Sequence, residues 1–122
     1  MSKVALVVDD SKSIRMLVSK VLREAGFDVL EAENGRQAME RLAGREAVQL
    51  VITDLNMPIM DGLELIRAIR ADAAQRFTPV VFLTTESDDS LKDAAKSAGA
   101  TGGIGKPFHP EKVLTVGKRV VA

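Results

Sequence analysis

Five short apolar segments rich in Val, Ile and Leu recur along the chain, and polar or glycine-containing stretches separate them. Near-continuous apolarity, rather than strict alternation with polar residues, indicates strands that are covered on both faces, as in a parallel sheet. The predicted strands are Val4–Val8, Asp28–Ala32, Leu50–Thr53, Val80–Thr84 and the glycine-rich Gly102–Gly105.

Between these segments the apolar spacing changes to that of a helix. Apolar residues from Ile14 to Leu22 follow the i, i+3, i+4, i+7 and i+8 template of an amphipathic helix. Four later helices are predicted to begin with a capping or first-turn residue: Asn34, Asp61, Asp88 with Asp89, and Pro110. Five strand–helix units predict one doubly wound α/β domain over residues 1–122, with no output domain.

Composition excludes several classes of protein. The chain has 17 basic and 17 acidic residues, so no net charge attracts it to nucleic acid or to a membrane surface. It has no cysteine, which excludes disulfides and thiolate metal sites. No uncharged stretch approaches the roughly 20 residues that a membrane-spanning helix needs. We therefore expect a cytoplasmic protein.

Polar residues follow the predicted strands at their carboxyl ends. Asp9 and Asp10 follow the first strand, Asp54 the third and Lys106 the fifth, while Thr84 ends the fourth. Open α/β sheets bind ligands at this edge, where the winding reverses. In a 2-1-3-4-5 strand order the first and third strands are neighbours, so we expect the three acids in one pocket.

Three clustered carboxylates are suited to binding a cation. Two carboxylates 4 Å apart repel by about 4 kcal/mol at an effective dielectric constant of about 20, and a bound cation offsets this repulsion. Oxygen ligands without His or Cys favour a hard ion such as Mg²⁺. A metal, Lys106 and the Thr84 hydroxyl together suit phosphoryl transfer, with Asp54 as the nucleophile.

Five motifs occur in an order and spacing that resemble the receiver domain of bacterial response regulators, most of all the single-domain chemotaxis type. The motifs are Val8-Asp9-Asp10, Thr53-Asp54-Leu55-Asn56-Met57-Pro58, Asp61-Gly62, Leu83-Thr84-Thr85 and Lys106-Pro107-Phe108. The resemblance covers essentially the whole chain. It implies a flavodoxin-like (βα)5 sheet with the strand order 2-1-3-4-5.

The resemblance also implies roles for individual residues. Asp54 is the expected phosphoacceptor, and Asp9 and Asp10 hold Mg²⁺ together with Asp54 and the backbone carbonyl of Asn56. Thr84 and Lys106 are expected to contact the phosphoryl group, with a cis bond between Lys106 and Pro107.

Two further expectations concern the lifetime and the effect of the phosphoryl group. The side chains of Asn56 and Glu86 are predicted to orient a hydrolytic water. Receiver domains usually have an aromatic residue three positions before the lysine, where this chain has Gly103. We expect a gap there. We also expect phosphorylation to cause a weaker conformational shift, carried by the loop after the fourth strand and by the fourth helix, and a larger shift in Gly103→Tyr or Gly103→Trp.

The resemblance implies a monomeric signalling switch rather than an enzyme with an external substrate. A sensor histidine kinase is the expected phosphodonor, and another protein is the expected target. One alternative is a phosphorelay intermediate that passes the group to a second histidine. A phosphatase of the haloacid-dehalogenase type is less favoured, because it usually needs two aspartates spaced by one residue and Asp9 and Asp10 are adjacent. A flavin carrier is less favoured too, because it needs a phosphate-binding loop after the first strand and this sequence lacks one.

Overall fold

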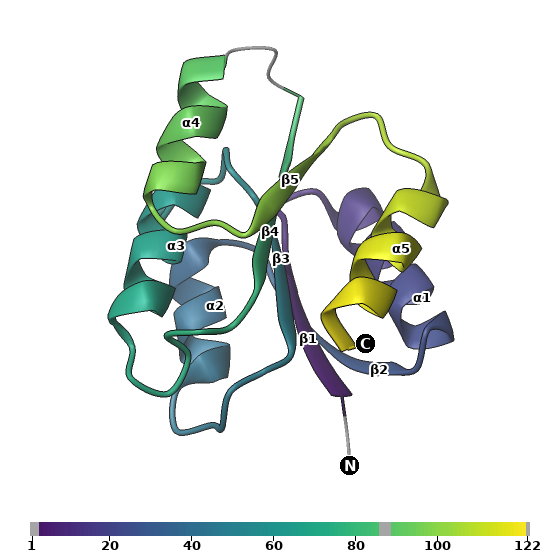
Figure 1. The fold of residues 1–122 in the computed structure, drawn as a ribbon, viewed down its shortest axis with the longest axis horizontal. Coiled ribbons are helices and arrows are strands. Elements are labelled where there is room, and N and C mark those ends of the chain that lie inside the picture. The colour runs from purple at the N-terminus through teal and green to yellow at the C-terminus, as the bar shows by residue number, and fades with distance from the viewer. Residues whose placement is uncertain (1–2, 86–88, 122) are drawn as a thin grey trace.

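The structure is a computed structural model that describes residues 3–85 and 89–121, and strands alternate with helices throughout it (Figure 1). The strands are β1 (Lys3–Val8), β2 (Phe27–Ala32), β3 (Leu50–Asp54), β4 (Val80–Thr84) and β5 (Gly102–Gly105). The helices are α1 (Lys12–Glu24), α2 (Gly35–Leu42), α3 (Gly62–Ala71), α4 (Asp89–Ser97) and α5 (Pro110–Val121). The predicted alternation of elements is confirmed.

The strands form one parallel sheet in the order β2-β1-β3-β4-β5, which confirms the predicted fold class. Helices α2, α3 and α4 cover one face of the sheet, and α1 and α5 cover the other (Figure 1). Every residue of β3 and β4 is buried, which explains why these segments are apolar throughout. All five strands end at the same edge of the sheet, so the residues that follow them lie near one another.

Each face of the sheet has its own apolar core. Leu6, Ile66 and Phe82 belong to the core under α2, α3 and α4, and Leu22 and Val113 to the core under α1 and α5. Full burial of one such side chain stabilises the fold by about 1.5–3 kcal/mol. Within the described ranges, no helix has the length and apolarity needed to cross a membrane.

Side-chain caps begin the second and third helices as predicted. The Asn34 side chain accepts a hydrogen bond from the Gln37 N–H at 2.8 Å, and Asp61 accepts one from the Glu64 N–H at 2.9 Å. Glu64 bonds back to the Asp61 N–H, which completes a capping box. Gln37 instead bonds back to the N–H of Glu33, one residue before the cap, at 2.8 Å.

The gap expected at Gly103 is partly filled, because the Phe82 ring lies against this glycine while open grooves still reach it. Gly103 pairs with Phe82 of β4, and a Cβ atom added at position 103 would lie 2.3 Å from the Cζ atom of the Phe82 ring. Phe82 is only 2% exposed, so its ring fills the place of the missing side chain. A groove of about 130 Å³ remains beside it, lined by Phe82, Thr84, Lys92, Lys96, Gly103, Ile104 and Gly105.

Candidate functional site

The three predicted acids meet at the carboxyl edge of the sheet. Asp9 and Asp10 follow β1, and Asp54 ends the neighbouring strand β3. One carboxylate oxygen from each of these three residues lies within 4.8 Å of the other two. Residues far apart in the sequence therefore form one acidic cluster, as the strand order predicts.

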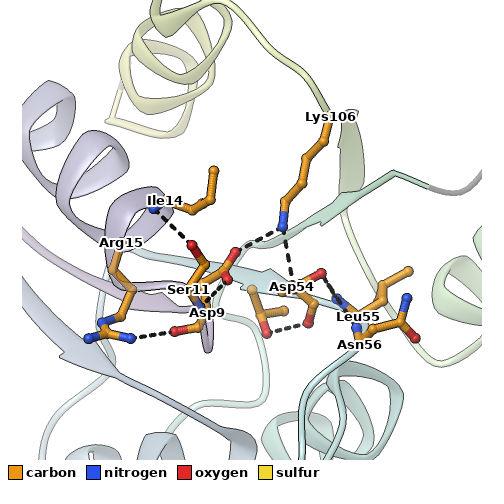
Figure 2. Close-up of polar contacts among 9 residues, drawn as sticks. Asp9, Ser11, Ile14, Arg15, Asp54, Leu55, Asn56 and Lys106 are labelled. Carbon is orange, nitrogen blue, oxygen red and sulfur yellow. Dashed lines mark hydrogen bonds and ion pairs between the residues drawn. The ribbon is translucent and has the colours of Figure 1, made fainter.

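Asp9 is fully buried, and both of its carboxylate oxygens have partners (Figure 2). Its Oδ1 atom accepts a hydrogen bond from the Ser11 N–H at 2.9 Å, and its Oδ2 atom lies 3.0 Å from the Lys106 ammonium. The Ser11 side chain caps α1 by accepting from the Ile14 N–H at 3.4 Å. Because Ser11 takes the capping role, the carboxylates of Asp9 and Asp10 remain at the cluster.

Asp54 is held by backbone donors on one side and by a cation on the other. Its Oδ1 atom accepts from the Leu55 N–H at 2.8 Å and from the Asn56 N–H at 3.4 Å, and its Oδ2 atom lies 3.3 Å from the Lys106 ammonium. Burial raises the pKa of the Asp54 carboxyl above its ordinary value, and the charge of Asp9 raises it further. Lys106 and the Asn56 N–H lower this pKa, but the raising effects win.

Lys106 reaches the cluster from the end of β5 (Figure 2). Its ammonium pairs with Asp9 and Asp54 at once, and the side chain is 13% exposed. Its bond to Pro107 is cis, as the resemblance implied. Lys106 thus places a positive charge between two carboxylates whose mutual repulsion would otherwise be larger.

The other predicted site residues lie along the same edge. Thr84 is the last residue of β4 and is 2% exposed, and Asn56 is an exposed residue of the loop after β3. The metal-ligand role of the Asn56 carbonyl and the phosphoryl contact of Thr84 stay predictions. Glu86, like the expected cap Asp88, lies outside the described residues.

Gly62 allows α3 to begin close to the acidic site. A Cβ atom at this position would lie 2.3 Å from the carbonyl oxygen of Asp54 and 2.7 Å from the Cα atom of Leu55. Only glycine permits this approach, and the Gly62 N–H donates to the Leu55 carbonyl at 3.0 Å. The motif Asp61-Gly62 therefore combines a helix cap with the close packing that fixes the end of β3.

Sequence reasoning missed one group beside the cluster. The Arg15 guanidinium donates to the backbone carbonyl of Asp9 at 2.8 Å and lies near two acids of the β2 region, Glu31 at 3.5 Å and Glu33 at 3.9 Å. A charged residue in the first turns of an amphipathic helix is ordinarily solvated, so no local pattern indicates these contacts.

The arrangement combines a buried nucleophilic carboxylate, two further acids, an ammonium and a hydroxyl-bearing residue at one edge of the sheet. Carboxylate oxygens are the donor set that Mg²⁺ prefers, so the residues present fit this ion. The set matches the requirements of phosphoryl transfer to an acid.

The fold and this site define a phosphorylatable signalling domain of the two-component type. Residues 5–117 match the response regulator receiver domain, and the chain belongs to this family. The predicted resemblance is confirmed.

Individual relatives include chemotaxis proteins. The chain is 40% identical over 107 residues to chemotaxis protein CheY1 of Helicobacter pylori, covering 87% of this chain and 86% of that protein. It is 42% identical over 107 residues to a CheY homolog of Campylobacter jejuni, covering 87% of this chain and 82% of that protein. A solved structure of chemotaxis response regulator CheY4 of Vibrio cholerae superposes with a TM-score of 0.90 at 41% identity, covering 98% of this chain and 99% of that one.

Proposed function

We propose that this receiver domain is a chemotaxis switch that accepts a phosphoryl group from a sensor histidine kinase onto Asp54. The position of Asp54 carries the proposal: its carboxylate lies between the Lys106 ammonium and the N–H groups of Leu55 and Asn56, beside two further acids. The relationship to the chemotaxis proteins of three organisms supports the chemotaxis assignment.

In the proposed reaction, a carboxylate oxygen of Asp54 attacks the phosphorus atom of a phosphohistidine. The P–O bond to Asp54 forms as the P–N bond breaks, and the histidine ring leaves with the electron pair of that bond and takes up a proton. The Leu55 and Asn56 N–H groups keep the carboxylate in place during the attack. Lys106 neutralises charge on the transferring oxygens, and Thr84 donates a hydrogen bond to one of them.

The acidic cluster is the proposed site for Mg²⁺, with Asp9, Asp10, Asp54 and the Asn56 carbonyl as ligands. Bound there, the ion would offset the negative charge of the carboxylates and the phosphoryl oxygens. Asp9 is fully buried and held by Ser11 and Lys106, whereas Asp10 is exposed. The site thus combines one fixed carboxylate with one that solvent reaches.

The downstream action is proposed to be a contact with a target protein rather than turnover of an external substrate. Contacts of Thr84 and Lys106 that form only in the charged state would shift the conformation of the loop after β4 and of α4. A phosphorelay intermediate stays the alternative, since it needs the same acceptor site. The cytoplasmic location and the monomeric state stay predictions.

Incubation with Mg²⁺ and acetyl phosphate, followed by mapping of the modified residue, tests the proposal. We expect one phosphoryl group on Asp54 and none in Asp54→Asn, which keeps the shape of the side chain but removes the nucleophile. Asp61→Asn is the matched control, because Asp61 caps α3 outside the cluster. Modification of Asp54→Asn at the wild-type rate would contradict the assignment.

The phosphorelay alternative needs a second measurement. The phosphorylated protein is mixed with a histidine phosphotransfer domain, and the label on each protein is followed over time. Hydrolysis in place is the result expected of a terminal switch, and rapid transfer to the histidine would favour the relay.

A further inference from the structure

The Arg15 side chain lies beside the acidic cluster and is only 12% exposed. Its Nη1 atom donates to the backbone carbonyl oxygen of Asp9 at 2.8 Å, and Figure 2 shows the guanidinium pointing from α1 toward that carbonyl. Two acids pair with other nitrogen atoms of the same guanidinium: Glu31 lies 3.5 Å from Nε, and Glu33 lies 3.9 Å from Nη2. Arg15 therefore connects the end of β1 to the end of β2.

These contacts hold the backbone of Asp9 on both sides, and the carbonyl that Arg15 bonds belongs to the peptide that joins Asp9 to Asp10. The Asp9 N–H donates to the Ala32 carbonyl at 3.1 Å, and the Asp9 carbonyl accepts from Arg15. The Asp10 side chain is exposed and makes no hydrogen bond or ion pair with any other described residue. The backbone that carries Asp10 is therefore what directs its carboxylate toward the cluster.

We propose that Arg15 is a positioning residue for the divalent-cation site and holds the Asp9–Asp10 peptide so that both carboxylates face the ion. The inference rests on the proposed Mg²⁺ site. Three nearby carboxylates repel one another when no cation is bound, and the exposed Asp10 gains hydration by turning into solvent. The hydrogen bond from Arg15 opposes this movement. Glu31 and Glu33 hold the guanidinium in the orientation that makes the bond.

The sign of the effect separates positioning from simple electrostatics. A positive charge near a cation site weakens cation binding by Coulomb repulsion, so loss of the Arg15 charge alone would strengthen it. Loss of a positioning hydrogen bond weakens it, and removal of such an outer contact typically costs about tenfold or more in metal affinity. The two explanations thus predict opposite changes in the Mg²⁺ dissociation constant of Arg15→Gln.

The test is titration of the whole chain with Mg²⁺ alone, followed by the amide NMR shift of Asp10, in wild type, Arg15→Gln and Arg15→Lys. We expect both variants to bind Mg²⁺ about tenfold more weakly. Lysine keeps the charge but lacks the planar guanidinium, which donates to a carbonyl and to a carboxylate at the same time. Arg23→Gln is the matched control, because Arg23 also pairs with Glu31, at 3.5 Å, but its side chain is 53% exposed and reaches no atom of Asp9.

Two further measurements separate positioning from a general loss of structure. Thermal unfolding without Mg²⁺ shows whether each variant is folded. If Arg15→Gln is unfolded, the Mg²⁺ affinity of Arg15→Lys tests the role of Arg15. Saturating Mg²⁺ is expected to restore phosphorylation by acetyl phosphate, since the defect lies in binding the ion.

Wild-type or tighter Mg²⁺ binding by both folded variants would overturn the role of Arg15 and leave the metal site intact. Equal weakening in Arg23→Gln would overturn it as well. A wild-type protein that binds no Mg²⁺ would overturn the proposed metal site and this inference together.

Discussion

Filling the position of Gly103 is expected to destabilise the fold, although glycine in a strand is normally unfavourable. A Cβ atom at this position would lie 2.3, 2.4 and 2.8 Å from three atoms of the Phe82 ring. No real Cβ contact is that short, so Gly103→Ala forces a ring that is 2% exposed to move.

The size of the effect follows from two opposing contributions. Overpacking of a well-packed core costs about 1–3 kcal/mol. Replacing a strand glycine gains about 0.5–1 kcal/mol, because the unfolded chain becomes less flexible. We expect Gly103→Ala to lower the free energy of unfolding by about 1 kcal/mol, near the middle of the range that these two contributions leave. Gly102→Ala is the control on the same strand, because nothing lies within 4 Å of its added Cβ, and it is expected to stabilise.

A double-mutant cycle tests whether the two positions share one space. Phe82→Ala alone leaves a cavity and costs about 3–5 kcal/mol. Gly103→Phe alone introduces a second ring where one already lies. In the double variant a ring enters the same space from the neighbouring strand, so we expect the combined loss to be smaller than the sum by about 2 kcal/mol.

Urea unfolding followed by far-ultraviolet circular dichroism gives these free energies, since the chain has no Trp or Tyr for fluorescence. Additive effects, within about 0.5 kcal/mol, would refute the shared space. A Gly103→Ala variant as stable as Gly102→Ala would refute it too. The expected larger response of Gly103→Tyr and Gly103→Trp is therefore best measured together with Phe82→Ala, where an aromatic ring has room.

Four further predictions concern the site and its loop. The pKa of Asp54 is raised in the folded state above the unfolded value of 3.8, so the native state binds this proton more tightly than the unfolded state does. The free energy of unfolding therefore falls as the pH rises from 3.8 through the raised pKa of the folded state. Asp54→Asn should thus be more stable than wild type near pH 7 and lose this pH dependence. Urea unfolding at several pH values tests this, and a variant that is less stable than wild type near pH 7 would contradict it. Asp10→Asn should bind Mg²⁺ more weakly yet fold normally, and phosphorylation that persists in chelator would contradict the metal site. Asn56→Ala should change the rate at which the phosphorylated protein loses its label, and an unchanged rate would remove its role in orienting water. Ile59 has a φ angle of 71° and is 73% exposed, so Ile59→Asn should stabilise by about 1 kcal/mol in urea unfolding, whereas Ile59→Val should not.

The sequence by itself determined the order of the elements and most of the site. Strands buried on both faces must be apolar along their length, so β3 and β4 were predictable from the sequence alone. Asn34 and Asp61 cap their helices through contacts three residues away, which a local pattern contains. The acids and Lys106 were predictable as a group, because parallel strands end at one edge of a sheet.

Only the tertiary structure decided the contacts that cross between elements. The sequence shows a missing side chain at Gly103, but not that Phe82 from the adjacent strand fills its place, because ring direction depends on packing. Arg15 has the pattern of a solvated helix residue, and only the fold brings Glu31 of β2 and the following Glu33 beside it. The raised pKa of Asp54 likewise arises from burial and from Asp9, and neither exists before the sheet forms.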